Sequence, residues 1–392
     1  MPSTIAWLDS SREEQRRMRE VINLFAQTES RDELGIGQVR DSFSDRLFPG
    51  TSTLHTRARY LVLIPWCYRS AARLATSGED LQRRAADNER RLIVALNNAG
   101  AHDGLIGRNV LTKLKTLPSA LYWSALGQWG VLIGDVEDEL AARSWRHEAD
   151  ELVERAPSMW NIPPAPTGFP DTADTLDLSF EEAAWIRERM LSGSPGSLLE
   201  VLLHADDAAR LQVPAAWDVP VDDDALADLM AHAWLFSLIV QGAALSYNLA
   251  LARRYEDQGL SRFEAPVDRY LAEIEDWVHE LDSERAALTA WDLSDLWSGV
   301  LAHNPRISWA TRDFVDTFVA LLRNGKRPDH EQILALVISR EKRQKGTQSR
   351  LVNDKLLRNW TGASGTGRLT YRWANVTRLL TDVSGGLQRA PA

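Results

Sequence analysis

The chain has 392 residues, of which 44% are hydrophobic and 26% charged, and its formal net charge is −10. These values are typical of a soluble globular protein with two or three domains, and they exclude a mainly disordered chain, a collagen-like repeat and a protein with many membrane spans. The single cysteine, Cys67, excludes an intramolecular disulfide. Because charged residues between Arg12 and Arg17 interrupt any N-terminal apolar run, we predict no signal peptide and expect a cytoplasmic protein.

The first third of the sequence places apolar residues at helical spacing, interrupted by glycine and proline. One helix is expected behind the Pro-Gly turn that ends at Gly50; it carries Arg57 and Arg59 and is kinked or ended by Pro65. The other helices predicted in this region cover residues 10–28, 32–47, 81–99 and 136–156, with two short helices within 105–134.

A proline-rich stretch follows, with five prolines between residues 157 and 170. Neither a helix nor a central strand tolerates this density of proline, so we predict a linker at residues 157–178. Ser179 and Glu182 then have the spacing of a capping box, which predicts that a helix begins there.

A run of 24 positions between Asp228 and Arg253 contains no Asp, Glu, Lys or Arg. Its length could span a bilayer, but polar residues such as Gln241 and Asn248 favour a buried central helix over residues 225–254 and no contact with a membrane. Aspartates at 222–224 and the arginines Arg253 and Arg254 suit the two ends of its dipole.

Helical spacing continues to the C-terminus, with helices predicted at 267–281, 309–322, 329–345 and 351–360 and a last one that reaches about residue 383. Residues 368–373 are expected as a short strand or as the start of that last helix. No long alternating segment occurs, so the predicted fold is mainly α, with two or three helical subdomains and at most this short β element. The predicted regions are an N-terminal helical domain at 1–156, the linker at 157–178, an acidic helical middle domain at 179–325 and a basic C-terminal helical region at 326–392.

The charge is unevenly distributed along the chain. Residues 135–300 contain 34 acidic and 11 basic residues, whereas residues 323–378 contain 13 basic and 4 acidic ones. A basic end on an acidic protein is typical of a nucleic-acid-binding region, and it also suits a surface that docks on the acidic region.

Motifs that would assign a catalytic mechanism are missing from the sequence. It contains no Walker-type phosphate loop, no nucleophile elbow and no closely spaced His/Cys cluster, so neither a cofactor nor a metal is predicted and the chain is more typical of a non-enzyme. Asp41 and Asp45 share a helical face, and together with Asp9 they are the candidates for Mg²⁺ ligands if the protein is a metal-dependent nuclease.

Two segments combine cations with aromatic residues, which is the combination that binds phosphates and stacks on bases. The first surrounds Tyr60, and the second follows the glycine-containing loop at 362–367 and is preceded by a cationic run at 340–350. The predicted nucleic-acid contacts are Arg57, Arg59, Lys342, Arg343, Lys345, Arg368, Tyr371, Arg372 and Trp373. Cation–π packing or an internal ion-paired interface explains the same residues.

The segments Ile5–Asp9, Leu47–Ser52, Thr56–Tyr60 and Ser364–Leu369, with Pro65-Trp66 and Tyr371-Arg-Trp373, resemble those of an uncharacterised bacterial family of unknown function. The resemblance runs over nearly the whole chain. Members of such families tend to be encoded beside helicase-like antiphage genes, so the resemblance implies a role in defence. It assigns no catalytic residues.

Three hypotheses follow from the sequence. The first is a non-catalytic subunit that contacts nucleic acid, DNA rather than RNA, within a bacterial antiphage assembly that includes proteins such as a helicase. The second is an adaptor that binds other proteins but no nucleic acid, and the third is a metal-dependent nuclease.

Overall fold

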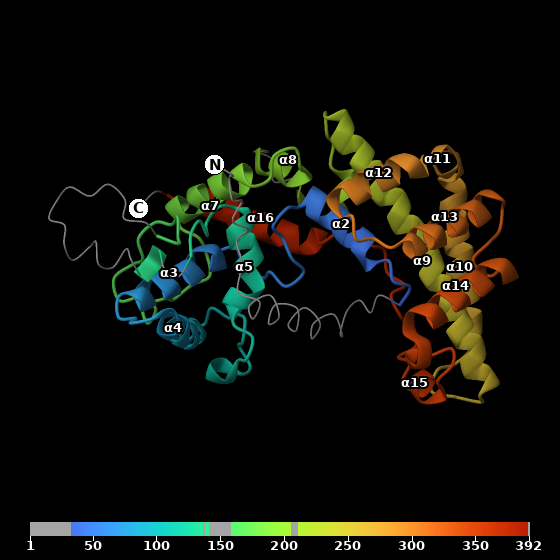
Figure 1. The fold of residues 1–392 in the computed structure, drawn as a ribbon, viewed down its shortest axis with the longest axis horizontal. Coiled ribbons are helices and arrows are strands. Elements are labelled where there is room, and N and C mark those ends of the chain that lie inside the picture. The colour runs from blue at the N-terminus through green and yellow to red at the C-terminus, as the bar shows by residue number, and fades with distance from the viewer. Residues whose placement is uncertain (1–32, 136–137, 141–157, 205–210, 391–392) are drawn as a thin grey trace, which may run out of the picture. The chain divides into compact units, whose positions relative to one another are not determined.

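The computed structural model describes residues 33–135, 138–140, 158–204 and 211–390 (Figure 1). Over these ranges every regular element is a helix, and the only β feature is an isolated bridge between Leu132 and Trp160, which confirms the mainly α fold. The helix predicted at 10–28, most of the one predicted at 136–156 and the candidate ligand Asp9 lie outside the described residues.

The contacts between described residues group them into two compact units. Unit 1 takes its described residues from 47–214 and 372–390, and unit 2 takes them from 33–46 and 215–371. The grouping follows contacts rather than chain order, since the last helix belongs with the N-terminal half of the chain.

Unit 1 is built around a buried apolar helix, α3, which packs against α4 and α5. The C-terminal helix α16 lies beside α7, so segments far apart in the sequence share one core (Figure 1). The helices of unit 1 are α3 (Tyr60–Ala72), α4 (Gly78–Asn98), η1 (Leu111–Lys113), α5 (Pro118–Gln128), α7 (Phe180–Ser192), α8 (Leu198–His204) and α16 (Trp373–Leu387).

Of the two alternatives predicted for Pro65, the structure excludes an end of the helix, because Pro65 lies inside α3. The predicted start of this helix is corrected, because Arg57 precedes α3 and Arg59 is its N-cap. Arg57 is held outside the helix because the hydroxyl of Tyr122 bonds its N–H and its carbonyl, at 3.1 and 2.9 Å.

The capping box predicted at the start of α7 is confirmed. The N–H of Glu182 donates to the Ser179 hydroxyl at 3.1 Å, and the N–H of Ser179 donates to the Glu182 carboxylate at 3.0 Å. The proline-rich segment before it packs on α3, where the Trp66 indole donates to the carbonyl of Pro163 at 2.9 Å.

Unit 2 surrounds the long helix α9, against which α10 and α14 pack. Residues 368–372, where the chain leaves unit 2, form no strand, and Tyr371 and Arg372 have φ of 50° and 68°, in the left-handed region. The helices of unit 2 are α2 (Gly37–Leu47), η3 (Ala216–Asp218), α9 (Asp224–Asp257), α10 (Pro266–Ser283), α11 (Arg285–Ala290), α12 (Leu293–His303), α13 (Trp309–Arg323), α14 (Glu331–Lys345), η4 (Gly346–Gln348) and α15 (Asp354–Arg358).

The uncharged run of the sequence forms the middle of α9. Asp223 caps this helix by accepting from the N–H of Leu226 at 2.7 Å. By length and composition α9 could cross a membrane, but 94% of its 18-residue apolar window is buried inside the protein. Gly242 lets α10 approach closely, since a Cβ at this position would lie 2.5 Å from the ring of Trp277.

Candidate nucleic-acid interface

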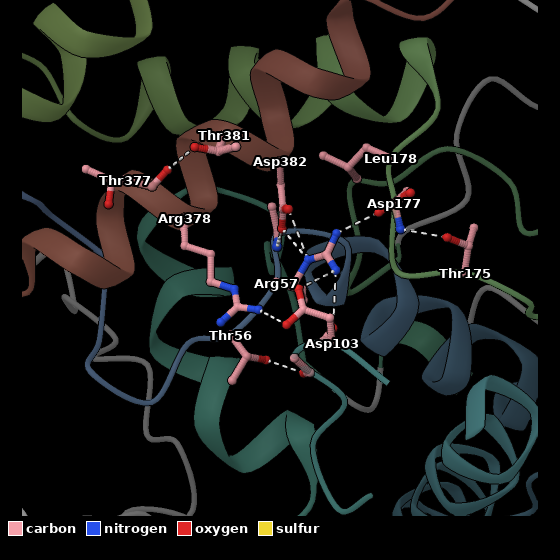
Figure 2. A network of polar contacts seen from close by, with 12 residues as sticks. Thr56, Arg57, Asp103, Thr175, Asp177, Leu178, Thr377, Arg378, Thr381 and Asp382 are labelled. Atoms are coloured by element: carbon pink, nitrogen blue, oxygen red, sulfur yellow. Dashed lines mark hydrogen bonds and ion pairs between the residues drawn. The ribbon is translucent and has the colours of Figure 1, made fainter. Parts of the chain in front are cut away.

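Arg57, the first of the predicted phosphate-binding residues, is held in an ion-pair network within unit 1. Figure 2 shows its guanidinium between carboxylates from different parts of the chain. Its Nε lies 3.0 Å from both carboxylate oxygens of Asp382, and its Nη2 donates to Asp177 at 2.7 Å. Only 11% of the Arg57 side chain is exposed, so little of it is accessible to a phosphate.

Further ion pairs extend this network. Arg378 pairs with Asp103, and Arg389 pairs with Asp177 at 3.0 Å. The guanidinium of Arg378 holds the pKa of Asp103 below its usual range, and that of Arg57 does the same for Asp177. Arginines and aspartates are equal in number in this network, so it offers no excess of positive charge to a polyanion.

Arg59, the other predicted phosphate-binding residue of the segment around Tyr60, faces the start of α7. Its Nη2 lies 2.9 Å from the carboxylate of Glu182, and its Nη1 donates to the carbonyl of Thr175 at 2.8 Å. Glu182 also belongs to the capping box of α7. Arg59 therefore joins the two segments on either side of the predicted linker instead of facing solvent.

The second predicted cluster, near the C-terminus, is also directed inward. Arg368 donates to the side-chain oxygen of Gln241 at 2.8 Å, pairs with Glu280 and lies over the ring of Trp234, 4.3 Å from its centroid. The hydroxyl of the buried Tyr371 donates to the carbonyl of Ala233 at 2.7 Å. Both side chains hold the loop after residue 367 against α9.

Arg372 and Trp373 belong to unit 1 and make backbone contacts there. Arg372 donates to the carbonyl of Thr51 at 2.7 Å. The indole N–H of the buried Trp373 donates to the carbonyl of Val213 at 3.1 Å. Trp373 therefore presents no free ring on which a base could stack.

Lys342 and Arg343 differ from the other predicted residues, because both are exposed and neither side chain has a partner among the described residues. Lys345 belongs to the same turn of α14 but pairs with Glu33, which also holds Arg350 at 3.0 Å. The predicted set thus separates into paired cations and an exposed pair at the end of α14.

Two further exposed cations follow on α15. Lys355 and Arg358 have no side-chain partner within the described ranges, and the acidic Asp354 beside them is compensated by Arg254 at 2.7 Å. Residues 342–358 contain six basic residues and one acidic residue. We call Lys342, Arg343, Lys355 and Arg358 the cationic end of unit 2.

The sequence analysis missed two exposed residues of unit 2 besides Lys355 and Arg358, namely Trp309 and Arg306. Trp309 begins α13 directly after the capping residue Ser308, and 68% of it is exposed. Arg306 precedes it in the loop and is exposed as well. The sequence contains a signal for Trp309, because this residue follows a serine that can cap the helix and precedes the apolar face of α13, which begins at Phe314.

The candidate metal ligands do not form a site within the described residues. No group of three or more His, Cys, Asp or Glu side chains there could hold a metal ion. Asp41 pairs with Arg40 at 2.9 Å, and Asp45 lies 3.7 Å from His303.

The fold and the exposed surface define a class: an all-helical protein of two units, one of which carries a cationic end. The chain belongs to a family of unknown function, DUF6361, which it matches over residues 2–386. This match confirms the resemblance to a family of unknown function over nearly the whole chain. No curated protein and no solved structure matches the chain.

Proposed function

We propose that this protein contacts nucleic acid, preferentially DNA, through the cationic end of unit 2, as a non-catalytic part of a larger assembly. The observation that carries the proposal is the exposure of Lys342, Arg343, Lys355 and Arg358 without compensating acids. Such cations bind phosphates by releasing condensed counterions, and this term supplies most non-specific affinity for nucleic acid.

The wider setting of the proposal does not come from the geometry. The resemblance suggests an assembly with helicase-like proteins and a role in bacterial antiphage defence, and the charged N-terminal sequence suggests a cytoplasmic location. Binding to nucleic acid can be tested without any of these partners.

The test is fluorescence anisotropy with labelled single-stranded and duplex DNA over a range of salt concentrations. We expect wild-type affinity to fall steeply with salt, and Lys342→Ala with Arg343→Ala to reduce the slope of log affinity against log salt by about 1 to 2.

A matched control is available in unit 1. Lys113 and Lys115 are exposed and have no side-chain partner in the described part of the chain, so their double alanine variant changes the net charge equally. An equal loss in both double variants would show only a general charge effect. If the wild type binds no nucleic acid at low salt but captures a defined protein through the cationic end, the adaptor hypothesis replaces this proposal.

A further inference from the structure

Trp309 is the one exposed tryptophan among those that the structure describes. Within the described ranges its ring stacks on no other ring and lies under no cation, and its indole N–H has no partner. Leaving so large an apolar ring in water forgoes the free energy of burial. Tryptophan is also enriched at binding interfaces relative to the rest of a protein surface.

Trp309 lies close to the end of α14, although 33 positions separate it from Lys342 in the sequence. The buried guanidinium of Arg340 donates to the carbonyl of Ala310 and to the hydroxyl of Thr311, both at 2.9 Å. These bonds join the start of α13 to the last turns of α14. The exposed ring therefore belongs to the same end of this helix pair as Lys342 and Arg343.

Two unpaired arginines accompany the ring. Arg343 follows Arg340 by three positions and so lies one turn further along the same side of α14. Arg306 precedes Trp309 by three positions in the loop before α13, and its side chain has no partner among the described residues. The nearest acid along α13 is Asp313, one turn after the ring and half-exposed.

We infer that Trp309 stacks on an unpaired base, so that the ligand of this surface is single-stranded nucleic acid. The inference rests on the proposed function, and it specifies that the bound nucleic acid is single-stranded. An aromatic ring flanked by phosphate-binding cations is the arrangement of single-strand binding surfaces, where each base offers a π-face. In a duplex those faces are covered by neighbouring base pairs, and exposing one costs unstacking energy.

The experiment compares Trp309→Ala and Trp309→Phe with the wild type, using a labelled single-stranded oligonucleotide and a duplex of the same length at one low salt concentration. We expect Trp309→Ala to weaken single-strand binding about 5- to 150-fold, the loss of one stacked base, and to leave duplex binding unchanged. The Phe variant should keep most of the affinity, because it keeps a π-face.

Leu74→Ala is the matched control, since Leu74 is 66% exposed and belongs to unit 1. Because both positions are on the surface, thermal unfolding should be unchanged in either variant. If Trp309→Ala binds single strands like the wild type while Lys342→Ala with Arg343→Ala binds them weakly, the stacking inference is overturned and the proposed function stands. If the wild type binds neither oligonucleotide, both are overturned, and an equal loss on single strands and duplex also contradicts stacking.

Discussion

The guanidinium of Arg57 is bonded to carboxylates of the protein itself. Its Nε–H points between the oxygens of Asp382, and the N–H of Ala58 donates to the same carboxylate at 2.8 Å. Asp382 belongs to α16, so these bonds fasten the C-terminal helix to the turn before α3. The outer pairs with Asp103 and Asp177 are more exposed and contribute less.

Replacing Arg57 with alanine tests this structural role. The Asp382 side chain is 9% exposed and would be left without its cation, so we expect the free energy of unfolding to fall by about 3 kcal/mol. Urea unfolding measures the change, and adding Asp382→Asn should restore part of the stability. If Arg57→Ala kept wild-type stability but bound DNA more weakly, the structural role would be wrong and Arg57 would be a nucleic-acid contact.

Glu89 is a buried carboxylate at the N-terminus of α5. One oxygen accepts from the N–H of Ser119 at 2.8 Å, whereas the other has no partner among the described residues. Burial raises its pKa from 4.5 to about 7, against the opposing effect of the Ser119 bond. The folded state thus binds this proton more tightly than the unfolded state does.

The contribution of Glu89 to stability is complete below about pH 4.5 and decreases as the pH rises through about 7. Across this range the wild type should lose up to about 3 kcal/mol of its free energy of unfolding. Glu89→Gln cannot ionise, so we expect this variant not to show that loss. Unfolding free energies of both proteins at pH 5 and pH 8 measure it, and a difference that does not change with pH would contradict this account.

At the scale of elements, α16 and α7 approach closely at a pair of adjacent glycines. A Cβ on Gly386 would lie 2.5 Å from that of Ala183, whereas a Cβ on Gly385 would meet nothing within 4 Å. Two neighbouring positions of one helix therefore differ only in what they face.

We expect Gly386→Ala to lower the free energy of unfolding by about 1 to 3 kcal/mol, because the helices must separate. Gly385→Ala should leave it unchanged or raise it by up to about 1 kcal/mol, since alanine favours the helix. Thermal or urea unfolding of the two single variants makes the comparison, and equal effects at both positions would show that the helices do not meet there.

Local patterns predicted most of the elements. The uncharged run forms α9, and Ser179 and Glu182 cap α7 through the predicted bonds. The start of α3 was missed because its backbone groups bond to Tyr122 and Asp382, which lie about 65 and 325 positions away. A local window of sequence does not contain partners that are so far away along the chain.

At the scale of the molecule, the amino-acid composition predicted which end of the chain is basic. It did not predict which of the cations there are paired with acidic side chains. Arg368 and Lys345 are compensated by Glu280 and Glu33, which belong to other parts of the sequence. Only the folded arrangement distinguishes them from Lys342 and Arg343. It also places Trp309 at the same end of the α13–α14 pair, which no spacing in the sequence indicates.

The central claim is that nucleic acid contacts this end of unit 2, and hydrogen–deuterium exchange with and without a saturating single-stranded oligonucleotide tests it most directly. We predict slower exchange in peptides that cover residues 304–311 and 341–358, and no change in those that cover residues 103–115 of unit 1. Unchanged exchange in the first two regions, or protection confined to unit 1, would contradict the claim.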